Sequence, residues 1–165
     1  MLVTLAAGDD DVDAAALIWA QATAARDGDR EPASLGAARG VIDAVLARSR
    51  HEFLLVAKAD DGPVTGFAIA GPVASGRAEV SYLGVRPDQW GTGVGSLLLA
   101  GLRERLTAAG YQAAELLVYV ANERAVALYQ RHGWRPAGPA TPHPRTGKPE
   151  QRYELILAGR AAWDS

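Results

Sequence analysis

Runs of apolar residues alternate with turn signals at spacings that predict a mixture of strands and helices. Short runs rich in branched or aromatic residues, closed by glycine, proline or aspartate, predict strands. These strands lie at 2–6, 53–57, 64–70, 78–85, 113–120, 134–137 and 151–157. Apolar positions three or four residues apart predict helices at 12–25, 33–49, 94–109 and 122–132.

Hairpins and one central strand–helix unit organise these elements. The first hairpin turns at 60–63, and a second turn at 71–76 leads into the strand at 78–85. A terminal hairpin turns through the proline-rich loop 138–149. The expected fold class is therefore α+β, or mixed α/β, with a largely antiparallel mixed sheet of about seven strands flanked by about four helices.

The first two helices have expected ends and apolar stripes. Carboxylates at a helix start accept unpaired backbone N–H groups, so we interpret Asp9, Asp10 and Asp11 as caps rather than metal ligands. Leu17 and Ile18 belong to the apolar stripe of the first helix. Pro32 fits the first turn of the second helix, where a missing N–H costs nothing.

Length and composition indicate one domain. The chain has 165 residues and 48% apolar content, enough to bury one core. We expect a single domain at 1–157, and a tail at 158–165.

Charge and cysteine content exclude several classes of function. A formal net charge of −2 without a long basic run argues against nucleic acid. The sequence contains no cysteine, which removes disulfides, thiolate metal sites and a cysteine acyl-enzyme. The acid-interrupted N-terminus has neither the basic region of a signal peptide nor the length of a membrane span. We therefore expect a cytoplasmic protein without a membrane partner.

The segment Trp90-Gly91-Thr92-Gly93-Val94-Gly95 lies between the central strand and its helix. Alternate glycines leave the amides of residues 91–96 unobstructed where the first amides of a helix lack internal partners, which predicts an anion site. A flexible turn and a phosphate loop of another kind are the alternatives. A Walker loop needs a lysine that is missing here, and a dinucleotide fingerprint needs glycine where the chain has Ser96.

Two segments carry a resemblance to a known family. Residues 85–98, V-x-P-x-x-W-G-x-G-V-G-x-x-L, resemble the acetyl-CoA loop of the GNAT superfamily of N-acetyltransferases. Residues 122–134 are similar to the family's N-x-x-A-x-x-L-Y-x-x-x-G-F segment, with Trp134 in place of the final Phe. Trp90 stands where the family usually has Arg or Gln, which leaves the loop amides in place. Two segments in the right order are far more specific than one glycine loop.

The resemblance implies acetyl-CoA as co-substrate, no metal, and a splay between the strands at 78–85 and 113–120 that admits the cofactor. Backbone amides of the loop would bind the pyrophosphate, and those of residues 83–85 would polarise the thioester carbonyl. The cofactor-binding residues implied are Leu83, Gly84, Val85, Trp90, Gly91, Thr92, Gly93, Val94, Gly95, Ser96, Asn122 and Tyr129.

Two residues match the family's catalytic positions. Acetyl transfer needs a neutral amine, and Glu79 occupies the position of the glutamate base, acting directly or through water. An exposed strand glutamate is the alternative for Glu79. Tyr129 corresponds to the general acid that protonates the leaving thiolate, with a purely aromatic core residue as its alternative. Asn122 is expected to cap its helix and to bind CoA or a water.

Substrate contacts are expected from family geometry alone. Trp19, Tyr82 and His143 are candidate acceptor contacts, although Trp19 also suits the core. No histidine has metal-ligand spacing with another, and His132 lies where a helix C-terminus favours positive charge. His51 is interpreted as structural or solvated.

Three hypotheses follow. The first is direct acetyl transfer to a small-molecule primary amine such as an amino acid, polyamine or antibiotic, or else to a protein N-terminus or lysine. The second is a non-catalytic acyl-CoA sensor, in which Glu79 and Tyr129 are dispensable. The third is a nucleotide-binding domain that binds ATP or NAD but not CoA. Monomer and homodimer both remain open.

Overall fold

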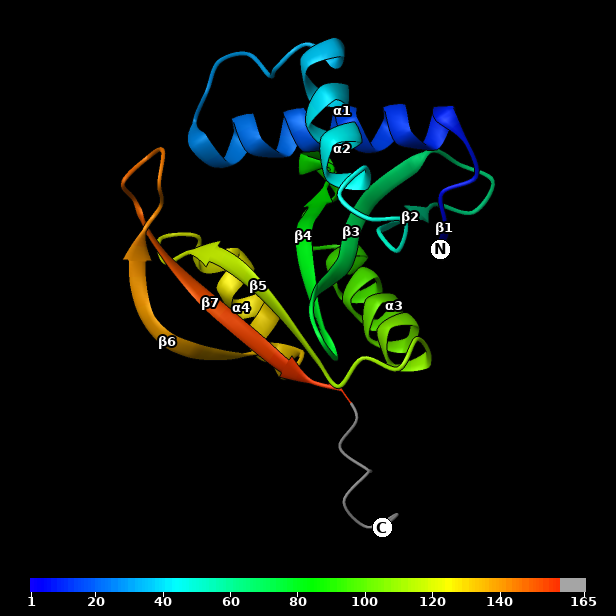
Figure 1. The fold of residues 1–165 in the computed structure, drawn as a ribbon. Helices are drawn as coiled ribbons and strands as arrows, with labels where there is room; N and C mark the ends of the chain where they lie inside the picture. Colours follow the sequence, from blue (N-terminus) through cyan, green and yellow to red (C-terminus); the bar gives the residue numbers. More distant parts are fainter. Residues whose placement is uncertain (158–165) are drawn as a thin grey trace. The chain divides into compact units, whose positions relative to one another are not determined.

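The computed structural model describes residues 1–157 and confirms the predicted mixed α/β fold. The seven described strands are β1 Leu2–Leu5, β2 Phe53–Lys58, β3 Val64–Ala74, β4 Arg77–Val85, β5 Ala113–Tyr119, β6 Arg135–Pro142 and β7 Pro149–Ile156. The described helices are α1 Asp9–Asp27, α2 Leu35–Leu46, α3 Val94–Ala108 and α4 Glu123–Arg131, with the short 3₁₀ helix η1 Pro87–Gln89 (Figure 1). Their sheet order is β1-β2-β3-β4-β5-β7-β6. The predicted tail at 158–165 lies outside the described residues.

The chain divides into two compact units. Unit 1 comprises residues 1–71 and 81–102, and unit 2 comprises residues 72–80 and the chain from 103 onward. The boundaries fall within β3, β4 and α3. The single domain expected at 1–157 stays a prediction.

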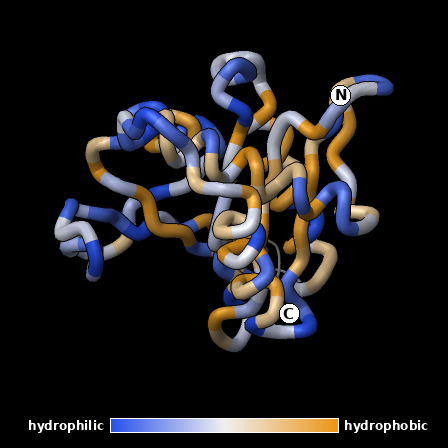
Figure 2. Tube along the Cα trace, turned by 90° about the horizontal axis from the view of Figure 1, so that it is seen from above, coloured by the Kyte–Doolittle hydropathy of each residue, from blue (hydrophilic) through white to orange (hydrophobic). Residues whose placement is uncertain are grey.

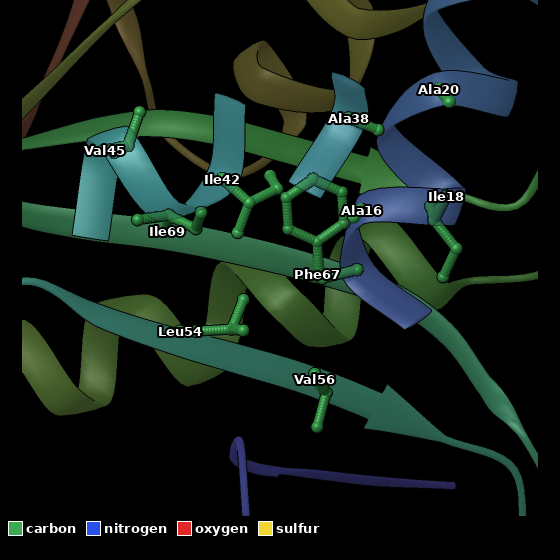
Figure 3. Close-up of a cluster of buried hydrophobic side chains, with 11 residues drawn as sticks. Ala16, Ile18, Ala20, Ala38, Ile42, Val45, Leu54, Val56, Phe67 and Ile69 are labelled. Atoms are coloured by element: carbon green, nitrogen blue, oxygen red, sulfur yellow. The ribbon is translucent and has the colours of Figure 1, made fainter. Parts of the chain in front are cut away.

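Unit 1 buries its core where α1 and α2 meet β2 and β3. Ile42 of α2 points toward Phe67 and Ile69 of β3, and all three side chains are fully buried (Figure 3). In α1 the buried positions are Ala15, Ala16, Ile18, Ala20 and Ala24. The prediction for Leu17 is wrong, because its side chain is exposed on the far side of the helix. The small alanine side chains let α1 lie close to the strands it covers, so the buried stripe of this helix is narrower than its apolar residues suggest.

Glycines in unit 1 bring β3 and β4 close to their neighbours. A Cβ at Gly66 would lie 2.7 Å from a methyl of Val94, and one at Gly84 would lie 2.6 Å from the ring of Phe67. Gly84 is therefore required by packing. The contact at Gly66 seats the first turn of α3 against β3, which fixes the point where the loop before α3 ends.

The acidic start of α1 differs from the prediction of three simple caps. Asp11 is buried, accepts the Ala7 N–H at 2.8 Å and lies 3.1 Å from the Lys58 ammonium. The hydrogen bond from the Ala7 N–H is the main cause that lowers the pKa of Asp11, and the Lys58 ammonium lowers it further. Burial has the opposite effect but is outweighed. Arg39 of α2 binds Asp9 and Asp13 at 2.9 and 2.7 Å, which ties α2 to α1.

Two further expectations about turns are wrong. Helix α2 begins after Ser34, whose hydroxyl accepts the Ala37 N–H, so Pro32 precedes the helix. Residues 71–74, expected in a turn, continue β3. Both predictions relied on proline as a local signal, and Ser34 rather than Pro32 marks the start of α2.

Unit 2 contains the sheet formed by β5, β6, β7 and the first residues of β4. β5 pairs antiparallel with β7 along its whole length, and it pairs parallel with β4 only from Arg77↔Ala113 to Glu79↔Glu115. The parallel pairing therefore involves only the first residues of β4 and β5. Helix α4 lies behind β5 and β7 in Figure 1, and the Gly133 that ends it lies beside Leu155 of β7.

The strand predicted at 134–137 extends further than expected, into the first part of the predicted proline-rich loop. Residues 135–142 form β6, an edge strand with an irregularity between Ala137 and Thr141. Proline cannot donate to a ladder, but an edge strand needs donors on one side only. The connecting loop therefore shortens to 143–148.

Hydropathy follows these elements: in Figure 2 hydrophobic residues concentrate along inner stretches of the trace and hydrophilic ones at several loops. Among the described helices, none has the length and apolarity needed to cross a membrane.

Candidate active site

The loop between β4 and α3 presents backbone without side chains. Gly91 and Gly93 have φ of +80° and +97°, the left-handed region that other residues rarely adopt. A Cβ built on either glycine would meet no heavy atom within 4 Å, so both face open space. Glycine is therefore favoured at these two positions by the left-handed backbone conformation and not by a lack of space for a side chain.

Hydrogen bonds brace the loop on both sides of Trp90. The Trp90 indole N–H donates to the Val85 carbonyl at 2.9 Å, and the Thr92 hydroxyl donates to the Gln89 carbonyl at 2.6 Å. The Arg86 guanidinium binds the Asp88 carboxylate at 2.7 Å and lowers the pKa of that carboxyl. Trp90 thus ties the loop to the end of β4, and its expected contact with the cofactor stays a prediction.

These residues fit the pyrophosphate of a CoA-type cofactor. The amides at the start of α3 have no carbonyl within the helix to bond, and the helix dipole places partial positive charge there. Gly91 and Gly93 leave the approach open to an anion. A diphosphate carries the charge and the acceptor oxygens that this arrangement can bind.

Glu79 lies on β4 in unit 2, directly opposite Glu115 of β5. It alternates with the buried Ala78 and Val80, so its side chain belongs to the less buried face of the strand. Glu115 itself is held by Arg77 at 3.4 Å and by Arg152 at 3.2 Å. The role of Glu79 as a base stays a prediction.

Asn122 caps helix α4 as expected, whereas the role of Tyr129 as a general acid stays a prediction. The Asn122 side-chain oxygen accepts the Ala125 N–H at 3.3 Å and caps the helix, which leaves its NH₂ group as a donor for other partners. Tyr129 is buried, with its ring centroid 6.1 Å from that of Trp134. Burial raises the pKa of the Tyr129 phenol to about 12. Its hydroxyl therefore keeps its proton at neutral pH, as a general acid must.

The three candidate substrate contacts fall into two groups. Trp19 and Tyr82 pack edge-on in unit 1, with ring centroids 6.3 Å apart. His143 belongs to unit 2, where its Nδ1 accepts the backbone N–H groups of Arg145 and Thr146. The structure thus brings Trp19 and Tyr82 together, and it gives His143 a role in shaping the turn between β6 and β7.

The expectation for His132 is wrong. Burial, together with the positive charges of Arg131 and Arg103, lowers the pKa of this imidazole. The end of α4 does not favour a charged histidine here, because the imidazole is partly buried and two arginines already supply positive charge. No group of three or more potential metal ligands occurs within residues 1–157.

An ionic network on the unit 2 sheet was missed at the sequence level. Arg77 of β4 binds both Glu115 and Glu154, and Arg152 also binds Glu115. Glu115 lies on β5, whereas Arg152 and Glu154 lie on β7, and only the register of these two strands brings them together. The only signal for this network in the sequence was the alternation of polar and apolar residues in the strands predicted at 113–120 and 151–157.

The fold and the glycine loop place the chain in a defined class. The protein belongs to the acetyltransferase (GNAT) family, whose model matches residues 16–134.

Among curated proteins, the chain is similar to the mycothiol acetyltransferase of Clavibacter michiganensis subsp. michiganensis, with 40% identity over 101 residues. That match covers 60% of this chain and 33% of the relative, so the chain spans about a third of that relative's length.

Solved structures share the fold. The ribosomal-protein-alanine N-acetyltransferase of Brucella melitensis aligns with a TM-score of 0.75 and 21% identity, covering 95% of this chain and 100% of the other. The PaiA N-acetyltransferase of Thermoplasma acidophilum, in complex with coenzyme A, aligns with a TM-score of 0.69 and 16% identity. That match covers 94% of this chain and 99% of the other.

Proposed function

We propose that the protein transfers an acetyl group from acetyl-CoA directly to the primary amine of a small molecule, in the cytoplasm, as a monomer or homodimer. The nitrogen lone pair attacks the thioester carbonyl carbon, and the carbon–sulfur bond breaks. The amine loses one proton and the leaving sulfur gains one, so the products are an amide and CoA.

The geometry of the loop at 90–95 is the observation that carries this proposal. Gly91 and Gly93 hold left-handed conformations with open space around them, immediately before the N-terminus of α3. Such a site suits the pyrophosphate of acetyl-CoA. Membership of the acetyltransferase family supports the same ligand.

Side chains of unit 2 supply the proton transfers in this proposal. A lysine-like amine with a pKa near 10.4 costs roughly 4 kcal/mol to present neutral at pH 7.4, and a base offsets that cost. Glu79 is the proposed base, directly or through water. Tyr129 is the proposed acid, since its phenol is protonated at neutral pH. Burial raises its pKa to about 12, which makes release of that proton to the thiolate harder.

A small-molecule acceptor is favoured over a protein acceptor on the curated relatives, which are named for mycothiol. The alternative, a protein N-terminus or lysine, has the name of the Brucella melitensis structure in its favour. That structure is 21% identical and supports the fold alone. A non-catalytic acyl-CoA sensor is the remaining competitor.

Thermal melting with and without acetyl-CoA tests the loop assignment first. Ligand at about 100 times Kd should stabilise the fold by roughly 2.7 kcal/mol, an easily measured shift in melting temperature. ATP and NAD serve as comparison ligands and should leave the melting temperature unchanged. If millimolar acetyl-CoA gives no shift, the segment 90–95 is only a turn.

Thiol release against a panel of amines and peptides then separates enzyme from sensor. Free CoA should appear only when an acceptor amine is present. Stabilisation by acetyl-CoA without thiol release for any acceptor, in the parent and in a Glu79→Gln/Tyr129→Phe variant alike, would favour the sensor.

A further inference from the structure

The outward face of β5 carries different chemistry at its two ends. Every second side chain from Ala114 to Val118 is buried, whereas Glu115, Leu117 and Tyr119 lie on the opposite, more exposed face. All of these residues belong to unit 2. The face therefore offers a carboxylate, an aliphatic side chain and an aromatic ring in a row.

Charges of both signs meet at the Glu115 end. Glu79 is its parallel partner on β4, and Glu154 is its antiparallel partner on β7. Two guanidiniums, Arg77 and Arg152, bind Glu115 and Glu154 at distances of 2.6 to 3.4 Å, and Arg135 of β6 lies opposite Glu154. The charges at this end therefore balance, and it is the proposed base Glu79 that places the acceptor amine here.

The loop 143–148 folds over the Tyr119 end in a defined turn. The His143 N–H donates to the Lys148 carbonyl at 2.8 Å, and the Gly147 N–H donates to the His143 carbonyl at 2.9 Å. The Tyr119 and Thr146 hydroxyls are 3.2 Å apart. The His143 ring lies 5.5 Å from the Tyr119 ring, centroid to centroid. The loop is thus anchored on Tyr119 before any ligand arrives.

Cations predominate in this loop. Lys148 Nζ lies 5.8 Å from the Tyr119 ring centroid, and the exposed Arg145 lies three residues earlier in the turn. Glu150 is the only carboxylate facing Tyr119 in the register of the described β5–β7 ladder. Between the two ends, Leu117 is 57% exposed, and its register partner Arg152 is bound to Glu115. The face therefore runs from a balanced group of charges, past an exposed aliphatic side chain, to a positive loop.

We propose that the acceptor is an amine whose chain ends in a carboxylate, a substrate class that deepens and rests on the proposed function. The amine lies at Glu79, the chain crosses Leu117, and the carboxylate binds at Arg145 and Lys148. Four residues along β5 separate Glu115 from Tyr119, which is about 13 Å at the rise of a strand. The best acceptor accordingly holds its amine and carboxylate about that far apart.

A series of ω-amino acids of increasing chain length, each paired with its neutral terminal amide, tests this proposal. Thiol release gives kcat and KM for every pair with acetyl-CoA saturating. The acid should exceed its amide in kcat/KM by about tenfold, the effect of one charge-assisted contact, and only for chains long enough to span both ends.

Substitutions in the loop identify the carboxylate partner. The double variant Arg145→Gln/Lys148→Gln should raise KM for the long acids about tenfold, leaving kcat and the KM of the amides unchanged. The single variant Lys148→Arg retains a cation at this position and should keep most of the preference for the acids over their amides. The matched control is Arg30→Gln/Arg50→Gln, which removes the same charge from exposed positions of unit 1.

Three results would overturn the inference. Equal turnover of acids and amides by the parent protein would remove its basis, and so would an equal change of both KM values in the double variant. Turnover of neither probe, while acetyl-CoA still stabilises the fold, would overturn the substrate class alone. A lack of stabilisation by acetyl-CoA would instead overturn the proposed function.

Discussion

The glycine loop of unit 1 and the helix α4 of unit 2 contribute to the proposed reaction in opposite ways. The loop offers backbone amides, and its key residues, Gly91 and Gly93, have no side chains at all. Helix α4 offers two side chains, the Asn122 amide and the Tyr129 phenol. A substitution in the loop can therefore act only by changing the backbone conformation. A substitution in α4 can instead remove a single side-chain group, such as the Tyr129 hydroxyl.

Tyr129→Phe gives the largest expected effect, because it deletes the proposed acid and keeps the buried ring. General acid catalysis contributes about 10²- to 10⁴-fold, so kcat should fall by at least about 100-fold while the melting temperature changes little. Tyr153→Phe is the matched control, since Tyr153 is equally buried in the same unit. Equal kcat values for both variants would remove Tyr129 from the mechanism.

Gly91→Ala tests the loop through its backbone. The left-handed conformation costs alanine about 1–2 kcal/mol, so the loop should shift and weaken acetyl-CoA binding by about tenfold. Gly28→Ala is the matched control. Gly28 has φ of +74° against +80° for Gly91, and both lie in open space. Calorimetry should detect weaker binding only for Gly91→Ala, although both variants lose similar stability; an equal affinity in the two would contradict the loop assignment.

The glycine loop and helix α4 could both be predicted from the sequence, because local signals determine them. The Asn122 cap, the Gly133 stop and the glycine run act on residues within a few positions of themselves, so local rules suffice. The family motifs added the assignments of Glu79 and Tyr129, which periodicity alone could not supply.

Errors arose where a distant partner decides the outcome. The buried Asp11 of α1 pairs with Lys58 at the end of β2, 47 positions later in the sequence. The prolines of β6 are tolerated because that strand lies at an edge, which depends on sheet order. The network around Glu115 requires the register of β5 with β7. None of these facts is encoded in the spacing of neighbouring residues.

Asn122 variants separate capping from ligand binding. Asn122→Ala removes both functions, and loss of a cap costs about 1 kcal/mol of stability. Asn122→Asp keeps the capping oxygen, removes the NH₂ donor and adds a negative charge that a helix N-terminus favours, so stability should be retained. If the amide binds CoA or its water, Asn122→Asp should still raise the Kd of acetyl-CoA severalfold. Parent-like affinity in Asn122→Asp would leave Asn122 as a cap alone.

The smallest effect is a difference in pH response between the two regions. The pKa of His132 at the end of α4 is lowered in the folded state, so the unfolded chain binds more protons and stability falls as pH drops below its ordinary 6.5. The pKa of Asp88 in the loop is also lowered, by Arg86, but its contribution is lost only as pH falls below its ordinary 3.8. Hydrogen exchange at pH 7 and pH 5 should therefore show loss of protection at the end of α4, with the loop unchanged. His132→Gln should flatten the response of α4 and leave that of the loop intact, whereas an undiminished response in this variant would assign the effect to another group.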